Sequence, residues 1–466
     1  MKQELLAKLS AFDQQHLLRF WDVLNDQEQA ELAEQIAAID FQSVADLFRE
    51  SGDAESIGKL AARAEPPRAI RRDAAENLFA ATEAIQAGHS ALAAGTVGAA
   101  MVAGGQGTRL GFDHPKGMFA IGPVSAASLF QIHVEKLLAI GRKYGVRIPL
   151  YLMTSPATDA ETREFFARHD RFGLAAEDLL IFCQGTMPAV DAESGRLLMT
   201  DRQRLFQSPD GHGGMLAALA GSGALDDMQH RGIRHLFYFQ VDNPLATVCD
   251  AELIGYHLLA RSQYTLQAVA KNSPLERVGN IVSIDGSLRV IEYSDLSDEA
   301  ALQRNADGSL KLWAGNIAVH VFDVGFLSDT SAGAVALPFH RALKKVTHVD
   351  EAGAKVHPDK ANAIKFERFI FDLLPAAERS LAVEADAKSA FAPLKNAKGS
   401  ATDSPESVQM QMMDLHRGWL RAAGASVDDE TRVEISPLFA LDAGELSKKI
   451  PSSTAVLQST YLAEPN

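Results

Sequence analysis

The chain has 466 residues, of which 47% are hydrophobic and 23% charged, and this length predicts two or three globular domains. A core of that size is stable without crosslinks and there are only two cysteines, so we expect neither a disulfide framework nor a cysteine zinc site. The formal net charge of −15 argues against nucleic acid as a general partner, although a nucleotide needs only a locally basic pocket.

Targeting signals are not evident in the sequence. Residues 1–6 lack the apolar core of a signal peptide, and no apolar run is long enough to span a bilayer. We therefore expect a cytoplasmic protein that does not bind membranes. The sequence leaves the oligomeric state open, with a monomer as the simplest expectation.

Residues 1–95 are predicted to form a helical N-terminal region. Apolar residues recur there at roughly helical spacing, as at Leu24, Leu32, Ile36 and Ile39. We find no chemistry in this region and interpret its acidic faces as solvated surface.

From about residue 96, short apolar runs alternate with amphipathic segments. Strands are predicted at 97–102, 148–153, 179–182 and 235–241, and helices at 128–144, 158–169 and, with a break, 213–231. This alternation predicts an α/β fold with a mostly parallel, doubly wound sheet and helices on both faces. Ligands of such sheets bind beyond the carboxyl ends of the strands.

The remainder of the chain has a different pattern. Strand-like runs at 264–270, 279–284, 288–292 and 316–322 predict a β insertion folded over the pocket. Residues 366–374 are predicted to be helical, and after about residue 385 the chain is expected to be irregular. One domain is therefore assigned to residues 96–385, and residues 386–466 are assigned to a small C-terminal accessory domain.

The strand at 97–102 leads directly into a glycine-rich loop with Gly104, Gly105, Gly107 and Gly111, and Pro115-Lys-Gly follows. Glycines let an anion approach the main chain closely, and N–H groups that follow a strand can cradle a phosphate. Arg109 and Lys116 add positive charge beside this loop.

Three kinds of phosphate loop compete for this motif. A Walker A loop is excluded because the chain has no Gly-Lys-Ser/Thr triplet. A dinucleotide fingerprint fits loosely as G-x-G-x-x-x-G at 105–111, but no tyrosine has the lysine four residues later that a short-chain dehydrogenase needs. The third interpretation uses the whole string, including the Arg and the Lys.

Further polar residues follow predicted strands. Asp242 closes the strand at 235–241, and a carboxylate there suits Mg²⁺, which takes one or two carboxylates plus phosphate oxygens. An aspartate in that place is otherwise a common turn former. Gln184 follows another strand, and a second glycine-dense turn contains Gly211 and His212.

A last group of residues suits a sugar phosphate. Glu292 and Tyr293 end one strand of the predicted insertion and Asn316 begins another, and such carboxylate and amide groups suit sugar hydroxyls. Lys365 and Lys395 are isolated lysines between apolar residues, which makes them candidates for phosphate contacts.

Taken in order, these motifs resemble those of the UDP-N-acetylhexosamine pyrophosphorylase family, a eukaryotic-type group of UDP-sugar pyrophosphorylases. The similarity covers residues from about 90 to 440. It comprises G-G-x-G-T-R-L-G…P-K-G at 104–117, Q-G at 184–185, P-D-G-x-G-G at 209–214, V-D-N at 241–243, E-Y-S at 292–294, G-N-I at 315–317, I-K-x-E at 364–367, P-L-K-N-A at 393–397 and E-I-S-P-L at 434–438.

The resemblance implies a GT-A-like nucleotidyltransferase core at 96–385 and a uridylyltransferase that makes UDP-N-acetylglucosamine and pyrophosphate from UTP and N-acetylglucosamine 1-phosphate, with Mg²⁺ or Mn²⁺. It assigns catalysis to Arg109, Lys116 and Lys365. It assigns nucleotide binding to Ala103, Gly104, Gly105, Gln184, Gly211 and Asp242. It assigns the sugar phosphate to His212, Gly279, Glu292, Tyr293, Asn316 and Lys395, and the metal to Asp242.

Two positions depart from the family pattern. His212 stands where acetylhexosamine members usually have Asn, whereas related UDP-glucose pyrophosphorylases have His in a similar turn, and Asn280 stands where valine is more usual. A glucose 1-phosphate or broad UDP-sugar pyrophosphorylase therefore stays open as an alternative. A nucleotide-sugar binding protein without turnover is more distant, because Arg109, Lys116 and Asp242 are all present.

Overall fold

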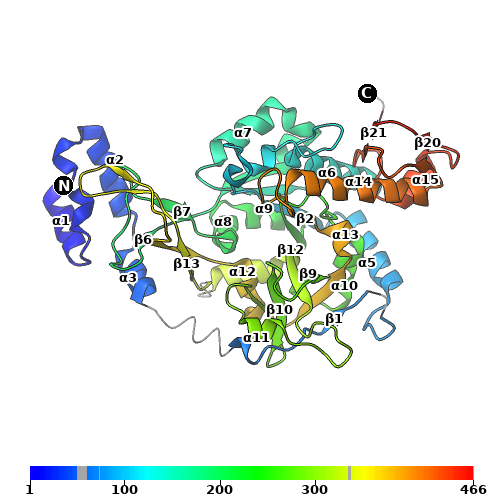
Figure 1. The fold of residues 1–466 in the computed structure, drawn as a ribbon, viewed down its shortest axis with the longest axis horizontal. Coiled ribbons are helices and arrows are strands. Elements are labelled where there is room, and N and C mark those ends of the chain that lie inside the picture. The colour runs from blue at the N-terminus through cyan, green and yellow to red at the C-terminus, as the bar shows by residue number, and fades with distance from the viewer. Residues whose placement is uncertain (50–59, 73, 334–336, 465–466) are drawn as a thin grey trace. The chain divides into compact units, whose positions relative to one another are not determined.

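The computed structural model describes residues 1–49, 60–72, 74–333 and 337–464 (Figure 1). The chain forms two compact units, which interleave along the sequence. The first unit contains residues 1–59, 184–215 and 336–372, and the second contains 60–183, 216–335 and 373–466. The division into segments 1–95, 96–385 and 386–466 therefore stays a prediction about domain boundaries.

The first unit combines N-terminal helices with short strands from two later segments. Its helices are α1 (Lys2–Ser10), α2 (Asp26–Ala37), α3 (Phe41–Arg49) and the 3₁₀ helices η1 (Gln15–Leu18), η2 (Trp21–Val23) and η7 (His212–Gly214). Its strands are β5 (Thr186–Pro188), β6 (Val190–Asp191), β7 (Gln207–Pro209), β13 (His340–Lys344), β14 (His348–Val349), β15 (Lys355–Val356) and β16 (Ala363–Glu367). They pair as β13-β16-β6, β5-β7 and β14-β15.

A hydrophobic core explains why these separate segments form one unit. Helix α2 begins at a capping box of Asn25 and Glu28 and buries Leu32 and Ile36. Those two side chains share a cluster with Val190 and Phe366 from the later segments. Burial of apolar surface thus joins the N-terminal helices to residues 184–215 and 336–372.

The second unit is built on a ten-stranded sheet with the order β1-β17-β9-β12-β8-β2-β3-β4, to which the hairpin β10–β11 is added at β12. The strands are β1 (Ala69–Ile70), β2 (Val97–Val102), β3 (Leu150–Thr154), β4 (Leu179–Cys183), β8 (His235–Gln240), β9 (Tyr264–Ala270), β10 (Gly279–Ile284), β11 (Ser287–Ile291), β12 (Ala314–Asp323) and β17 (Ser380–Ala385). Two small parallel pairs follow near the C-terminus, β18 (Ser426–Val427) with β20 (Ala455–Val456) and β19 (Val433–Ile435) with β21 (Thr460–Leu462).

The second unit also contains helices of varied length. They are α5 (Ala81–Ala93), α6 (Leu129–Tyr144), α7 (Asp159–Arg168), α8 (Met215–Gly221), α9 (Ala224–His230), α10 (Ala251–Leu259), α11 (Asp298–Ala301), α12 (Val324–Ala332), α13 (Ala387–Ala390), α14 (Pro405–Ala422) and α15 (Ala443–Lys449). Short 3₁₀ helices are η3 (Thr108–Leu110), η4 (Lys116–Met118), η5 (Asp170–Gly173), η6 (Ala176–Asp178) and η8 (Ile370–Ala376). No helix within the described ranges is both long and apolar enough to cross a bilayer.

The predicted α/β architecture with a mostly parallel sheet is confirmed. Strands β4, β3, β2 and β8 run parallel to one another, and so do β1, β17 and β9 at the other end of the sheet. Strand β12 is antiparallel to both β8 and β9. The predicted separate β insertion is therefore wrong for β9 and β12, which lie inside the main sheet, and only the hairpin β10–β11 branches from it.

Two further predictions are wrong. Residues 366–374 are not one helix, because residues 363–367 form the strand β16 and a 3₁₀ helix follows at Ile370–Ala376. Residues after 385 are not irregular throughout, because α14 runs for 18 residues from Pro405. The side chain of Ser404 caps that helix, and Val408, Met412 and Leu420 form its buried stripe.

Helices α5 and α10 lie side by side (Figure 1) and touch through their backbones. A Cβ at Gly88 would stand 1.8 Å from the carbonyl oxygen of Ala251, and a Cβ at Gly255 would stand 1.7 Å from the carbonyl oxygen of Ala84. Neither helix can carry a larger residue at its glycine unless the pair moves apart.

We predict that Gly255→Ala lowers the free energy of unfolding by about 1–3 kcal/mol, because the new methyl group overpacks this contact. Gly418→Ala is the matched control, since Gly418 lies in α14 with nothing within 4 Å of its added Cβ. That control should gain up to about 1 kcal/mol from helix propensity. Urea unfolding of the three proteins checks this, and equal stability of both variants would contradict the close contact.

Candidate functional site

The glycine loop after β2 folds back on itself. The N–H of Gly107 donates to the carbonyl of His114 at 2.8 Å, and the N–H of Lys116 donates to the carbonyl of Gly105 at 3.0 Å. Gly107 permits this return, since a Cβ there would stand 2.7 Å from the carbonyl oxygen of Phe112. The fold-back places Lys116 next to the beginning of the loop although Lys116 lies 11 positions after Gly105.

Buried groups of the neighbouring strand hold the loop open. The N–H of Ala103 donates to Met153 at 2.8 Å, and the hydroxyl of Ser155, which is fully buried, donates to the carbonyl of Gly104 at 2.7 Å. Among the described residues, the N–H groups of Gly104 and Gly105 have no acceptor. Two donors are thus left for an anion, as the sequence predicts for a phosphate cradle. Ser155 lies outside every motif on which the predicted site was based.

Lys116 and Asp242 form an ion pair, with Nζ 3.1 Å from Oδ2 and exposed fractions of 19% and 12% for the two side chains. Burial alone would raise the pKa of Asp242, but the ammonium of Lys116, followed by that of Lys395, outweighs it and holds the pKa below its usual value. Asp242 is therefore an ionised carboxylate between two lysines at neutral pH.

The backbone around Asp242 fixes this group to the segment that carries Lys395. The carbonyl of Asp242 accepts from the N–H of Leu394 at 2.8 Å. The buried amide of Asn243 donates to the carbonyl of Ala390 at 2.8 Å and accepts from the N–H of Ala392 at 3.0 Å. The motifs V-D-N and P-L-K-N-A, which are far apart in the sequence, thus form one structure.

Asp403 is a second carboxylate near this group, and the sequence analysis did not identify it. Its carbonyl accepts from the N–H groups of Lys395 and Asn396 at 2.8 and 2.9 Å. Burial raises the pKa of Asp403, against the charge of Lys395, and the charges of Asp242 and Glu276 raise it further. Its only sequence signal is its place before Ser404, which is typical of a turn at a helix start.

The residues around Asp242 fit a magnesium ion that is bound mainly by substrate. In the described part of the chain, no three Asp, Glu, His or Cys side chains cluster as a complete metal cage. Mg²⁺ does not require one, since it commonly takes one or two carboxylates together with phosphate oxygens and waters. The ionised carboxylate of Asp242, beside an anion cradle, is a donor of this kind.

Four of the residues predicted for the sugar lie near one end of the hairpin β10–β11. Gly279 pairs directly with Asn316 across β10 and β12. A Cβ at Gly279 would stand 3.0 Å from Oε1 of Glu292, so the glycine leaves room for that carboxylate. Tyr293 follows and is 47% exposed. The structure therefore gathers a carboxylate and an amide at neighbouring strand ends.

Asn280, which stands where the family usually has valine, has a structural role that does not involve the residues predicted for the sugar. Asn280 is 2% exposed, and its Oδ1 accepts from Nζ of Lys271 at 2.5 Å. Successive residues of a strand face opposite sides of the sheet, so Asn280 points away from the side on which Gly279 meets Glu292. The amide satisfies a buried ammonium, which valine could not do.

The first unit contains the residues predicted for the base. Gln184, which is 7% exposed, precedes Gly185, whose carbonyl accepts from the N–H of Asp210 at 3.1 Å. The carboxylate of Asp210 is buried and pairs with Arg368 at 3.0 Å. The motifs Q-G and P-D-G-x-G-G are therefore side by side, and the sequence analysis did not identify the buried charges that hold them.

His212 has a defined tautomer. Its Nδ1 accepts from the N–H of Ile370 at 3.2 Å, so the proton is on Nε2, which is a donor. Burial, with a smaller contribution from His340, lowers the pKa of His212 to about 4. At neutral pH this side chain is thus a neutral donor, the same role that an asparagine amide could fill. Gly211 before it has φ of +85° and packs on Arg368.

The three residues predicted for catalysis do not form one cluster within a unit. Lys365 is on β16 of the first unit, with Nζ 4.9 Å from the ring centre of Phe206, and burial lowers its pKa. Lys116 and Arg109 belong to the second unit. Arg109 is exposed in η3 and has no carboxylate partner among the residues that the structure describes.

A doubly wound sheet with an anion cradle and an ionised aspartate at adjacent strand ends is the arrangement of a nucleotidyltransferase. Residues 51–457 match the family described as UTP–glucose-1-phosphate uridylyltransferase, and the chain belongs to this family. Its members are enzymes of the nucleotidyltransferase class.

Within that family, several of the most similar relatives are acetylhexosamine enzymes by name. The chain is 39% identical over 368 residues to the UDP-N-acetylglucosamine pyrophosphorylase of Saccharomyces cerevisiae, covering 78% of this chain and 77% of that protein. It is 35% identical to the human UDP-N-acetylhexosamine pyrophosphorylase-like protein 1, covering 91% and 86%. The solved Trypanosoma brucei uridine diphosphate N-acetylglucosamine pyrophosphorylase, crystallised with an inhibitor, superposes with a TM-score of 0.81 at 28% identity, covering 96% and 94%.

The ion pair predicts a pH dependence of stability. The pKa of Asp242 is depressed in the folded protein, so its ionised form contributes stability above its unfolded pKa of about 3.9, and this contribution is lost as the pH falls through the folded value. In Lys116→Met the buried carboxylate loses its main partner. We expect the variant to be about 1–3 kcal/mol less stable at pH 7.

Urea unfolding at pH 7, 5 and 3.5 measures this. The advantage of the wild type should shrink below about pH 4, where Asp242 is protonated in the unfolded chain. A difference that stays constant from pH 7 to 3.5 would contradict the assignment of the effect to Asp242.

Proposed function

We propose that the chain is a uridylyltransferase that forms UDP-N-acetylglucosamine and pyrophosphate from UTP and N-acetylglucosamine 1-phosphate. The observation that carries the proposal is the 3.1 Å pair of Lys116 and Asp242 beside the open loop at Gly104 and Gly105. The names of the relatives from yeast and human supply the sugar class.

The reaction requires little covalent catalysis by the protein. An oxygen of the sugar 1-phosphate attacks the α-phosphorus of UTP in line, and the bond to the bridging oxygen of pyrophosphate breaks. The attacking phosphate is already largely ionised at neutral pH, so no general base is required. The protein must instead align two polyanions and neutralise their charge.

Lys116 and Arg109 supply fixed positive charge for this alignment. Lys116 is held by the fold-back of the loop and is poised between Asp242 and any phosphate bound at Gly104 and Gly105. Asp242 would hold Mg²⁺, with Mn²⁺ as a substitute. The bound ion adds positive charge on the phosphate oxygens.

The remaining residues bind and orient the substrates. Gln184 and Gly211 hold the uridine end, and Lys365 and Lys395 contact phosphates. Glu292, Tyr293 and Asn316 hold the sugar, and Gly279 leaves room for it because it has no side chain. His212 donates a hydrogen bond to the sugar phosphate through Nε2. The two cysteines, which are both unpaired, are compatible with a cytoplasmic location, which we also propose.

Substrate selectivity is the first prediction of this proposal. With UTP and Mg²⁺, pyrophosphate release should be robust with N-acetylglucosamine 1-phosphate and at least about tenfold slower with glucose 1-phosphate, since each lost buried contact costs about this factor. A coupled assay with a panel of sugar 1-phosphates measures this. The opposite ranking would replace the proposed sugar by glucose.

The role of Lys116 is the second prediction. Lys116→Ala should lower turnover by about a hundredfold or more, because a fixed donor to the developing charge is lost. Lys448→Ala on α15 is the control, since Lys448 is exposed and should leave turnover unchanged. If Lys116→Ala kept activity within a few-fold of the wild type, the assignment would be refuted.

A further inference from the structure

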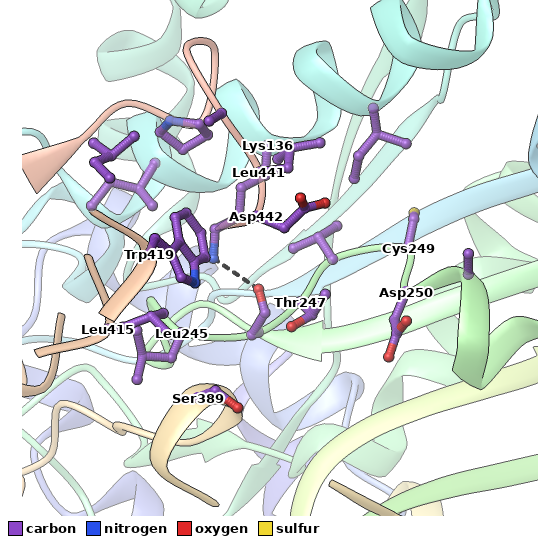
Figure 2. Close-up of a pocket in the computed structure, with 18 of the residues that line it drawn as sticks. Lys136, Leu245, Thr247, Cys249, Asp250, Ser389, Leu415, Trp419, Leu441 and Asp442 are labelled. Carbon is purple, nitrogen blue, oxygen red and sulfur yellow. Dashed lines mark hydrogen bonds between the residues drawn. The ribbon is translucent and has the colours of Figure 1, made fainter. Parts of the chain in front are cut away.

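A cavity in the second unit is lined in part by residues 244–252, the segment that follows Asp242 in the sequence (Figure 2). Its volume is about 380 Å³, in the range of small-molecule sites. Helices α5, α6 and α14 contribute to its wall, and residues 244–252 close it. No residue of the proposed substrate site lines it.

The wall of this cavity is mainly apolar. Ile132 and Ile140 come from α6, Leu415 and Trp419 from α14, and Leu245 from the segment after Asp242. Figure 2 shows Trp419, Leu415 and Leu245 on one side of the space and Lys136 and Leu441 above it. Apolar and aromatic walls of this kind bind the hydrophobic body of a ligand.

Most charged groups of the wall already have partners within the protein. Lys143 pairs with Glu445 at 2.6 Å. The carboxylate of Glu434 accepts from the N–H groups of Val124 and Ser125 at 2.7 and 2.6 Å. Asp250 caps α10 by accepting from the N–H of Glu252 at 3.0 Å, and burial raises its pKa to about 6.

Lys136 differs from these groups. Its Nζ donates to the carbonyls of Pro244 and Ala246 at 2.5 and 2.8 Å, and no carboxylate of the described residues lies within ion-pair distance of it. Burial lowers the pKa of Lys136 to about 7. An ammonium has three N–H donors, so the two carbonyls leave one donor and most of the charge uncompensated.

We propose that this cavity is a second binding site, which takes a small amphipathic anion with its carboxylate on Lys136 and its hydrocarbon body along Ile132, Leu415 and Trp419. The cavity offers one unmatched cation and an apolar wall, and such a ligand supplies the complement of both. The inference does not depend on the reaction proposed for Asp242, because the test measures binding alone.

Decanoate is the probe, with decanol as its uncharged counterpart. Isothermal titration of the full-length wild type should show decanoate binding at one site, at least about tenfold tighter than decanol, since a charge-assisted bond is lost in the alcohol. Saturating UTP should not displace decanoate. Equal affinity for the two probes, no binding, or displacement by UTP would each overturn the proposal.

Variants locate the site. Lys136→Met should weaken decanoate at least about tenfold and leave decanol unchanged, whereas Lys136→Arg should keep decanoate within a few-fold. Lys143→Met is the matched control because Lys143 is already paired, and it should not change the affinity. If Lys136→Met does not fold, the affinity of Lys136→Arg for decanoate and the comparison of decanoate with decanol test the site. Unchanged affinity in folded Lys136→Met would contradict the site. Decanoate should also change the tryptophan emission of the wild type, and Trp419→Phe should remove this change. The absence of such a change in the wild type would likewise contradict the site.

Discussion

The candidate site depends on one electrostatic constraint: a lysine and an aspartate are buried against each other at the carboxyl ends of two parallel strands, β2 and β8. Lys116 and Asp242 are each mostly buried and stand 3.1 Å apart. Such a pair stabilises the fold only when both members are present, because removal of either leaves an uncompensated buried charge. The pair keeps the carboxylate ionised, and in the proposed reaction the ammonium transfers its contact to a phosphate.

The sheet order explains how two residues 126 positions apart come to share one place. Strands β2 and β8 are adjacent and parallel, with Val102 paired to Gln240. The chain therefore leaves both strands at the same edge, and Ala103 and Asp242 begin their loops side by side. Asn243 then binds the segment 390–392 and brings Lys395 to the same place.

Sequence patterns predicted the parts of the fold that rest on local alternation. The strands at β2, β3, β4 and β8 and the helix α6 were predictable from apolar periodicity and from glycine positions. The place of β12 was not, since its antiparallel insertion between β8 and β9 depends on long-range pairing. The short apolar run at 366–374 was ambiguous, because helix and strand cannot be distinguished by periodicity over so few residues. Helix α14 carried a signal, a Ser-Pro-Glu start, that the sequence analysis did not use.

The candidate site was predictable to a similar degree. Motif order identified Lys116, Asp242 and Lys395, and the structure brings them together. The motifs did not reveal the supporting roles of Ser155, Asn243 and Asp403 in the second unit, nor that of the pair of Asp210 with Arg368 in the first unit. All except Asp403 act through a backbone contact or a buried charge whose partner lies far away in the sequence. Short polar side chains in turns carry no pattern that separates such a role from an ordinary turn.

A double-mutant cycle on Lys116 and Asp242 tests the central claim most directly. The value of kcat/KM for pyrophosphate release is measured for the wild type, Lys116→Ala, Asp242→Ala and the double variant. If the two residues act on the same phosphates as a unit, the double variant should lose about as much as the worse single variant. Losses that multiply, as for independent sites, would contradict the account.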